Sequence, residues 1–493
     1  MALAYVRLAS ITLDHFANVD HGKLRLLSTD KIAAPSVLGL FGENGSGKTT
    51  LMRVLTLLKA LLTEKPLDDA WGNFINVDSE TAQLQVEFLG YPDVGRLPSI
   101  RVFYETALQR KKVVEGWIES LETAEKTEGL AIQSEKLWTE PLEGKVRTTA
   151  LMPVLKVDTS AQPTLFEPTA LQERLFGEKS TVKNDLRVGQ RLAAARRTSF
   201  LFSASLEEVL RQRSEENTEV PNCCGDLLQL LRRLKHFGRS ELFVMESSEN
   251  SWGSRNTLPL LMAEDCERAS REYRLLPLPM TKPFATFPKR MAEIRKSIAR
   301  LNTVLEQWVA GLSLGLAVLG SELGADGEKR ERAQLVAHRD HRDISLKGES
   351  DGIRKMLAVL PLLVAVYNHR SMTVAADDLD SGVFEPLLGT VVRMQAQGSR
   401  GQLIFTSHNL RTLEVLDSSC TAFTTADPLN RYVRLSAEAE TGNLRDAYYR
   451  RLILSTQETL QLGRLMDTGR LALAMREAGP PQDSVDCSTR SRV

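Results

Sequence analysis

The run Gly42-Glu43-Asn44-Gly45-Ser46-Gly47-Lys48-Thr49 follows an apolar stretch at residues 36–41 and precedes a helix-like sequence that begins at Leu51. This order of strand, G-x-x-x-x-G-K-T loop and helix predicts a phosphate-binding P-loop. Its glycines allow backbone N–H groups to surround the β- and γ-phosphates at a helix N-terminus, where an anion is stabilised. We expect Lys48 to neutralise phosphate charge and Thr49 to bind Mg²⁺. The alternative is a glycine-rich turn with a buried or solvated lysine.

Composition sets broad limits on the class of protein. The chain has 493 residues, of which 42% are hydrophobic and 26% charged, and this fits one elaborated globular domain or two. Lys plus Arg and Asp plus Glu both number 63, so nucleic acid or an anionic membrane could bind only through local patches. The five cysteines show neither an even pairing nor C-x-x-C spacing, which is typical of a reducing cytosol. The N-terminus has no signal-peptide layout and no apolar run approaches ~20 residues, so we expect a cytoplasmic protein without a membrane segment.

Hydrophobic periodicity outlines the first half of the chain. Strands are expected at residues 4–13 and 36–41, and a helix at 48–62. Alternating apolar and polar residues at 83–88 and 100–104 predict a small antiparallel sheet beside the nucleotide core, with a polar outer face. Residues 125–182 mix charge, Pro and Thr without a sustained period, which favours loops with short strands.

The middle of the chain is expected to be mainly helical. It holds two basic segments, residues 227–239 and 289–312, and is divided by residues 222–225 and by a proline-rich stretch that begins at Leu276. No long heptad array is present, so a long coiled coil is excluded. We interpret this part as an inserted helical arm.

An apolar strand ending in two acids, residues 372–378, is a candidate metal and catalytic element. Such a buried strand can direct the Asp377 carboxylate at Mg²⁺ or its waters, while Asp378 stands where a general base or water-orienting group would be. Taken alone the pattern is weak, because many strands end in an Asp turn.

Two further motifs flank this strand. Upstream, Glu349-Ser350-Asp351-Gly352 opens a helix, for which simple N-capping by Ser350 is the alternative interpretation. Downstream, residues 402–407 form an apolar strand that ends at His408, which could equally be a satisfied histidine at a strand end. The order of P-loop, serine-capped helix, acidic strand and histidine strand is hard to obtain from four unrelated features.

In this order the motifs resemble the ABC-type ATPase head, in the SMC/RecF/OLD branch. Residues 16–19 match that branch's F-x-N-V segment, residues 349–352 a degenerate signature motif with Asp351 in place of a usual glycine, and residues 379–382 the D-loop. The resemblance implies ATP and Mg²⁺ as cofactors. Together with the P-loop pattern, it assigns nucleotide binding to Gly42, Asn44, Gly45, Ser46, Gly47, Lys48, Thr49, Thr50, Ser350 and Gly352, catalysis to Asp378, His408 and Lys48, and metal binding to Thr49 and Asp377.

The predicted fold is therefore an α/β ABC-type P-loop ATPase head, with a nucleotide-binding sheet and an antiparallel subdomain, interrupted by a mainly helical insertion arm. The long separation of Lys48 from Asp377 supports this interruption. The domains are expected at 1–204 for the N-terminal half of the head, 205–328 for the arm, 329–436 for the C-terminal half, and 437–493 for a helical tail with a disordered end.

The resemblance also implies that ATP is bound between two heads, so a homodimer of heads or a higher homo-oligomer is expected. Lys48, Thr49, Asp377, Asp378 and His408 would come from one head, and Ser350 and Gly352 from the other. The family has Glu where this chain has Asp378, which is one methylene shorter, and slow hydrolysis is expected for that reason. The glutamine that completes the metal shell in the family is not found by spacing; Gln190 is one candidate that nothing selects.

Three functions remain open on the sequence. The C-terminal helices resemble those of OLD-like ATPases, which suggests a sensor of bacterial anti-phage defence, similar to the ATPases of Septu, PARIS or retron-associated systems, that controls a separate nuclease or toxin. The second is a RecF-like DNA-maintenance ATPase whose arm binds duplex DNA, although a solvated helical face explains the same basic residues. Those residues are Arg232, Arg233, Lys235, Lys289, Arg290, Arg295 and Lys296. The third is a non-hydrolysing scaffold gated by ATP.

Overall fold

The structure is a computed structural model that describes residues 3–26, 37–67, 69–93, 97–112, 128–142, 155–158, 166–167, 169–176, 180–216, 223–246, 256–264, 272–339, 342–434, 444–446 and 448. Nearly all of the tail predicted at 437–493 lies outside the described residues. No helix within the described part is long and apolar enough to cross a membrane.

A parallel sheet forms the centre of the molecule. Its strands run in the order β18 (Tyr432–Val433), β17 (Thr421–Thr424), β3 (Val37–Phe41), β16 (Gln402–Thr406), β15 (Thr373–Ala376) and β8 (Leu242–Met245). All neighbours are parallel except β18, which is antiparallel to β17. The central strands are buried on both faces, which explains why their sequences are continuous apolar runs rather than alternating ones.

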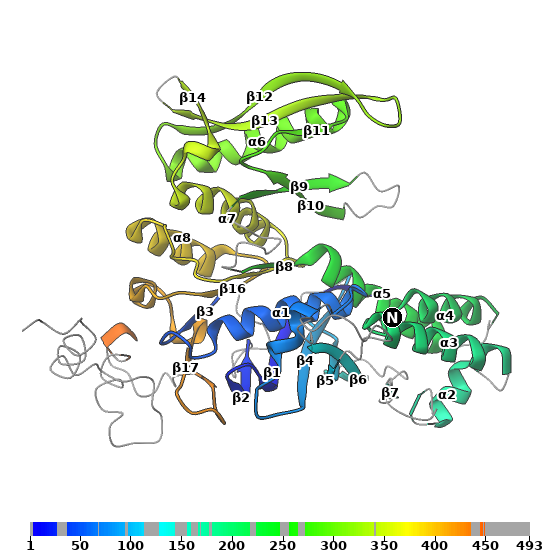
Figure 1. Cartoon of the computed structure of the whole chain (residues 1–493). Helices are drawn as coiled ribbons and strands as arrows, with labels where there is room; N and C mark the ends of the chain where they lie inside the picture. The colour runs from blue at the N-terminus through cyan, green and yellow to red at the C-terminus, as the bar shows by residue number, and fades with distance from the viewer. Residues whose placement is uncertain are drawn as a thin grey trace, which may run out of the picture.

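Helices cover both faces of this sheet. Helix α1 (Lys48–Leu62) contacts β8 and β15, whereas α7 (Asp351–Asn368) and α8 (Glu385–Gly398) contact β15, β16 and β3. Figure 1 shows α1 below the sheet and α7 and α8 above it. The strand at 36–41 and the helix at 48–62 are thus confirmed almost to the residue.

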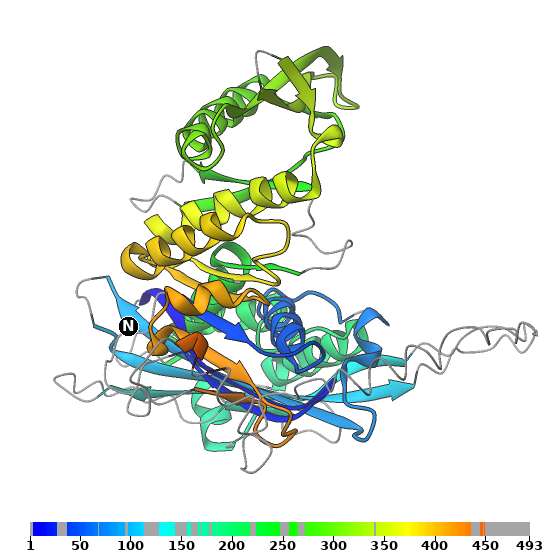
Figure 2. The same cartoon turned by 90° about the vertical axis from the view of Figure 1, so that its left-hand side faces the viewer.

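A second, antiparallel sheet lies on the far side of α1. Its order is β2 (Val19–Arg25), β1 (Leu3–Phe16), β4 (Thr81–Pro92), β5 (Ile100–Lys112), β6 (Glu128–Pro141) and β7 (Leu155–Asp158). Leucines of α1 and apolar residues of β1, β4 and β5 share one core cluster, so α1 is clamped between the two sheets (Figure 2). The predicted antiparallel sheet is confirmed. The long strand β6 replaces the short strands expected there, because the polar residues of its outer face and a register shift at Ala107/Leu108 obscure its period.

The outer face of this sheet is less polar than the sequence indicated. Tyr5 stacks on Tyr91 with ring centroids 4.6 Å apart, and Phe103 stacks on Trp138 at 5.0 Å. Both pairs are cross-strand neighbours in the register, on the face opposite the main core. The expected polar outer face is therefore borne out at Gln83, Gln85, Glu87, Arg101 and Glu105, and these two aromatic pairs interrupt it.

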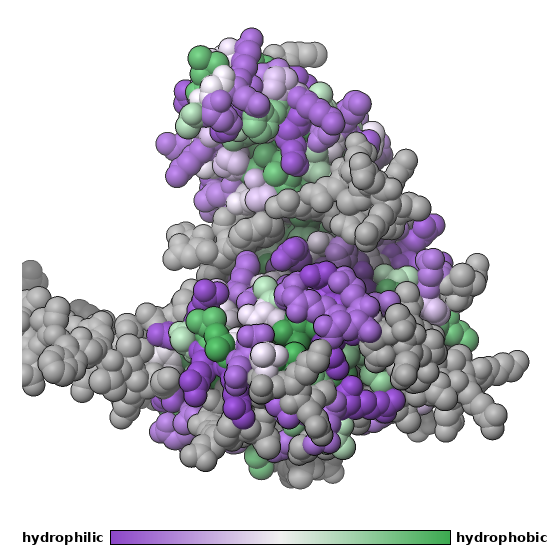
Figure 3. All heavy atoms as spheres, turned by 90° about the vertical axis from the view of Figure 1, so that its right-hand side faces the viewer, coloured by the Kyte–Doolittle hydropathy of each residue, from purple (hydrophilic) through white to green (hydrophobic). Residues whose placement is uncertain are grey.

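Four helices pack beside the antiparallel sheet: α2 (Thr169–Phe176), α3 (Ser180–Arg196), α4 (Ala204–Glu216) and α5 (Cys223–His236). The turn between α3 and α4 is tied to β6 by the buried Glu135 carboxylate. It accepts hydrogen bonds from Tyr104 Oη at 2.8 Å and from the backbone N–H of Phe200 at 2.9 Å. Burial raises the pKa of Glu135, and the hydrogen bonds that it accepts oppose this rise. Seen from the side on which these helices lie, the surface is largely hydrophilic with scattered apolar residues (Figure 3).

The inserted arm contains strands as well as helices. After α5 and the short helix η2 (Phe237–Glu241), the chain enters the parallel sheet as β8 and then leaves it for β9 (Thr257–Glu264), β10 (Glu272–Pro279) and β11 (Phe284–Thr286). Helix α6 (Pro288–Trp308) follows, and then β12 (Leu312–Leu323), β13 (Lys329–Arg339), β14 (Arg342–Ser345) and the short helix η3 (Leu346–Gly348). The arm stands at the top of Figures 1 and 2.

This composition differs from the mainly helical arm expected at 205–328. The proline-rich stretch at Leu276 forms β10, which pairs with β9 alone and can therefore hold prolines without breaking a central ladder. The basic segment at 289–312 does form helix α6, and the strands expected near 334–337 and 343–346 are confirmed as parts of β13 and β14.

Candidate functional site

The P-loop connects β3 to α1 with three glycines in left-handed or related conformations. Gly42, Gly45 and Gly47 have φ of 149°, 74° and 98°, which L side chains rarely adopt. At Gly42 an added Cβ would lie 1.8 Å from Thr424 Oγ1, so the position requires glycine for space as well. Lys48 Nζ donates to the carbonyls of Gly42 at 2.8 Å and Glu43 at 2.7 Å. The Lys48 side chain thus lies within the loop and bonds to two of its backbone carbonyls.

Two segments far away in the sequence support this loop. Tyr432 Oη on β18 donates to the Gly47 carbonyl at 2.8 Å, and Arg431 donates to the Asn18 carbonyl at 2.7 Å. The Asn18 side-chain amide in turn donates to the Gly45 carbonyl, and the Thr50 hydroxyl donates to Asn18 Oδ1 at 2.9 Å. The side chain of Thr50, predicted as a nucleotide contact, is therefore buried and engaged in holding the loop.

A third support comes from β17. Ser46 Oγ lies 2.5 Å from Thr424 Oγ1, and Thr424 Oγ1 donates to the Phe41 carbonyl at 3.2 Å. Strands β17 and β18, together with the turn between β1 and β2, fix the conformation of the P-loop. Sequence analysis found none of Thr424, Arg431 and Tyr432, because their relation to the loop exists only through the tertiary fold.

Tyr432→Phe tests this support. Loss of one buried hydrogen bond to Gly47 costs about 1 kcal/mol, so the affinity for a nonhydrolysable ATP analogue with Mg²⁺ should fall about fivefold. Isothermal titration measures the change, and Tyr367→Phe, near the C-terminal end of α7 and away from its Ser350 cap, is the matched control. An unchanged affinity in Tyr432→Phe would show that the loop holds its shape without β18.

The acidic strand end lies opposite the P-loop. Asp377 is 1% exposed, and its Oδ1 accepts a hydrogen bond from Thr406 Oγ1 of β16 at 2.6 Å. Asp378 has φ of 47°, an uncommon backbone for a non-glycine residue that Asp tolerates better than most. Its N–H donates to the same Thr406 hydroxyl at 2.7 Å, and its carbonyl accepts from Lys355 of α7. Thr406 and Lys355 therefore fix the backbone turn that directs both carboxylates.

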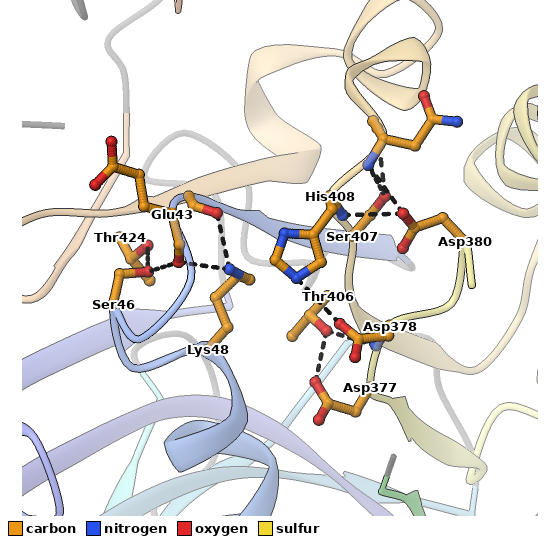
Figure 4. A network of polar contacts seen from close by, with 12 residues as sticks. Glu43, Ser46, Lys48, Asp377, Asp378, Asp380, Thr406, Ser407, His408 and Thr424 are labelled. Carbon is orange, nitrogen blue, oxygen red and sulfur yellow. Dashed lines mark hydrogen bonds and ion pairs between the residues drawn. The ribbon is translucent and has the colours of Figure 1, made fainter. Parts of the chain in front are cut away.

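His408 faces the second carboxylate. His408 Nε2 lies 3.4 Å from Asp378 Oδ1. The backbone N–H groups of His408 and Asn409 donate to Asp380 Oδ2 at 3.1 and 3.0 Å, so Asp380 positions the loop that carries the histidine. Figure 4 shows His408, Asp378 and Asp377 on one side and Lys48 with Glu43 and Ser46 on the other.

The Lys48 ammonium group faces the carboxylates of the acidic strand end across this space. Burial lowers the pKa of Lys48, whereas the carboxylates of Asp378, Asp377 and Asp380 oppose the lowering. A cationic amine, loop N–H groups at a helix N-terminus and facing carboxylates are the combination that binds a phosphate with a divalent cation.

The residues present suit Mg²⁺. Thr49 is exposed at the first turn of α1, next to Lys48, and Asp377 is held rigidly by Thr406. Hydroxyl and carboxylate oxygens are the donors that Mg²⁺ prefers, and it normally completes its shell with phosphate oxygens and water. In the described part of the chain no group of three or more His, Cys, Asp or Glu side chains is arranged to hold a metal ion.

The serine-capped helix begins beside the loop that follows Asp378. Ser350 caps α7 by accepting a hydrogen bond from the Ile353 N–H at 3.3 Å. A Cβ on Gly352 would lie 2.3 Å from the Gly382 carbonyl, so two glycine backbones touch there. Within the described residues, Ser350 and Gly352 contact their own helix and Gly382, and neither hydrogen-bonds to the P-loop of the same head.

Glu246 is a residue at this edge of the sheet that the sequence did not reveal. It follows β8, whose Met245 pairs with Ala376, so Glu246 and Asp377 leave adjacent parallel strands at the same edge. Glu246 Oε1 accepts a hydrogen bond from Thr56 of α1. Gln190 lies in α3 and not on a strand of the parallel sheet.

The topology accounts for the order of the motifs. The P-loop strand β3, the histidine strand β16 and the acidic strand β15 are consecutive neighbours. The serine-capped helix α7 packs on β15 and β16 from one face, and α1 with the antiparallel sheet lies on the other. The chain has the fold of an ABC-type P-loop ATPase head.

No family model and no curated protein matches the chain. Among solved structures it is similar to the Smc head domain with an extended coiled coil bound to the C-terminal domain of ScpA from Pyrococcus furiosus. That match has 9% identity and a TM-score of 0.38, and it covers 92% of this chain and 100% of the other.

Two further likenesses are weaker. The recombination mediator RecF with ATP matches at 12% identity and a TM-score of 0.35, over 88% of this chain and 99% of the other. The SMC head domain from Thermotoga maritima matches at 10% identity and 0.32, over 87% and 100%. The fold assignment rests on the chain's own topology rather than on these values.

Proposed function

We propose that this chain is an ATPase whose active site is completed by a second copy. The observation that carries the proposal is the division of its motifs within one head. The P-loop, Asp377, Asp378 and His408 face one another (Figure 4). Among the described residues, by contrast, Ser350 caps α7 and Gly352 touches Gly382, and neither hydrogen-bonds to this P-loop. A second head placed with its Ser350 helix against the γ-phosphate would add amide donors and the positive end of a helix dipole.

Each residue then has a defined role. Lys48 and the loop N–H groups hold the β- and γ-phosphates, and Thr49 and Asp377 hold Mg²⁺, which supplies charge neutralisation on the transferred phosphoryl group. Asp378 orients the attacking water and accepts its proton, and His408 holds Asp378 and contacts the γ-phosphate side of the site. The short Asp378 side chain makes turnover slow and the ATP-bound dimer long-lived.

We further propose that the dimer controls a separate effector, as in the OLD-like defence ATPases whose closing helices the C-terminal sequence resembles. A slow ATPase with a long-lived bound state suits a timer or sensor better than a motor. The support for this step is the resemblance together with the Asp378 substitution.

Ion pairs occupy four of the seven basic residues on which the DNA alternative was based. Arg232, Arg233 and Lys235 of α5 form ion pairs with Glu207, Glu241 and Glu207, and Arg295 of α6 pairs with Glu331. Moreover, α5 lies beside the antiparallel sheet and α6 in the arm, so the two basic segments do not form one surface (Figure 1). These pairs favour the interpretation of a solvated, internally neutralised face.

The experiment is phosphate release per head measured over a wide range of protein concentration. A composite site predicts that specific activity rises with concentration and then saturates. A constant, measurable specific activity would assign the whole site to one head. ATP binding without phosphate release at any concentration would favour the non-hydrolysing scaffold.

A further inference from the structure

Strand β12 is the open edge of the arm's sheet. The order of this sheet is β11-β13-β12, and β14 pairs with β13 on its other side, so β12 has β13 as its single partner among the described strands. In Figures 1 and 2 the ribbon of β12 and β13 lies at the end of the arm farthest from the parallel sheet. One row of its backbone N–H and C=O groups therefore points away from the sheet.

A side chain of α6 identifies which residues face outward. Asn302 donates to the Leu314 carbonyl at 2.9 Å and accepts from the Leu314 N–H at 2.8 Å. The amide of Asn302 thus takes the place of a neighbouring strand at Leu314. Since strand groups alternate with a period of two, the backbone groups of Leu316 and Val318 also face outward, beyond the reach of Asn302.

The outward edge beyond Leu314 is apolar and exposed. Val318 is 58%, Leu319 51% and Leu323 76% exposed. Residues 312–321 read Leu-Ser-Leu-Gly-Leu-Ala-Val-Leu-Gly-Ser and contain no charged residue and no proline. Natural proteins usually protect a free edge with charges or proline. Here, among the described residues, Asn302 covers the edge at Leu314 and an irregularity interrupts it between Val318 and Gly320. No described strand pairs with the edge from Gly315 to Val318.

We propose that β12 pairs with β12 of a second copy of this chain, antiparallel and centred on Ala317. In this register Leu316 lies opposite Val318 of the partner and Val318 opposite Leu316, so the outward groups make about four backbone hydrogen bonds. Ala317 lies opposite Ala317 of the second copy at the two-fold axis, where the facing Cα atoms are about 4.5 Å apart. The result is a continuous sheet across two arms.

A second copy fits this edge better than a charged peptide. Residues 312–321 carry no charge that could recognise a charged peptide. Two copies of this segment can also pair antiparallel without placing like charges opposite one another. Exposed Val318 and Leu319 of both copies would also cover one another. The interface uses none of the nucleotide-binding residues, so it stands or falls independently of ATP hydrolysis.

The test is disulfide formation by Ala317→Cys in the full-length chain under a mild copper–phenanthroline oxidation. The geometry at the two-fold axis permits a disulfide, and we expect cross-linked dimer to form at least about tenfold faster than in Ser313→Cys, since pairing raises the effective thiol concentration. Ser313 lies on the same face of β12 but away from the axis. Wild type is treated in parallel to reveal cross-links through native cysteines.

A second variant separates pairing from chance collision. Val318→Lys adds a charge at an exposed edge position and should leave the thermal transition unchanged, while it slows the Ala317→Cys cross-link to the Ser313→Cys rate. Equal rates for Ala317→Cys and Ser313→Cys, or an Ala317→Cys cross-link that Val318→Lys leaves unaffected, would overturn the proposal. In Lys48→Ala the cross-link should persist even when phosphate release is lost, which distinguishes the failure of this interface from the failure of the ATPase.

Discussion

Lys48→Ala should lower phosphate release by at least about a hundredfold, because the amine is the one cation that faces the transferred phosphoryl group from within the P-loop. Lys48 Nζ spans the loop between the Gly42 and Glu43 carbonyls and feels the carboxylates of Asp378 and Asp377 from the other side. Without it, the phosphates and those carboxylates would repel one another. The measurement is steady-state phosphate release at saturating ATP and Mg²⁺.

Lys23→Ala, at an exposed position of β2, is the matched control and should release phosphate at the wild-type rate. ATP affinity should also fall in Lys48→Ala, as read from a nonhydrolysable analogue. Turnover by Lys48→Ala within a few-fold of wild type would mean that Gly42–Thr49 is a structural turn.

Asp378→Asn is expected to separate binding from chemistry. An amide cannot accept the proton of the attacking water, so phosphate release should fall by about 10² to 10⁴. The amide has the same shape and suits the left-handed backbone, with φ of 47°, equally well. ATP should therefore still bind, and ATP-bound dimers should accumulate because they are no longer resolved by hydrolysis.

Size-exclusion chromatography with light scattering, with and without ATP, measures this accumulation. Asp417→Asn, in a turn before β17, changes the same charge elsewhere and serves as the control. If Asp378→Asn hydrolyses ATP normally, the water-orienting role belongs to another carboxylate, of which Glu246 is the nearest alternative by its place beside Asp377.

Local sequence was sufficient for several elements in and beside the parallel sheet. The strand before Gly42, the helix after Lys48, the strand before Asp377 and the serine cap at Ser350 are each specified by residues adjacent in the chain. Their signals are short-range: apolar runs, a glycine-rich turn and an N-cap. No such local pattern specifies the order of these strands in the sheet.

The supports of the P-loop could not be found in this way. Tyr432 and Gly47 are 385 positions apart and Thr424 and Ser46 are 378 positions apart, yet both pairs are in hydrogen-bond contact. No local sequence feature indicates which residue a tyrosine or threonine in a short strand will hydrogen-bond. Glu246 was missed for a related reason, because β8 is a four-residue strand inside a stretch that looked helical.

The arm was predicted to be mainly helical, and its strands were missed because they are short or irregular. In β12 the glycines at 315 and 320 interrupt an otherwise alternating pattern, and the prolines of β9 and β10 read as breaks. Two-stranded and edge positions tolerate such residues, so propensity underestimates strands there.

The composite site is tested most directly by mixing two inactive variants. Lys48→Ala removes the P-loop function of one head, and Ser350→Arg places a bulky charge at the helix N-terminus that the other head must present. Each variant alone should be inactive, since every site of its homodimer is damaged. In a mixed dimer one site pairs an intact P-loop with an intact Ser350 helix, so mixing should restore phosphate release to a sizeable fraction of wild type. Mixtures that stay as inactive as their components, at concentrations where the wild type dimerises and turns over, would contradict a site shared between two heads.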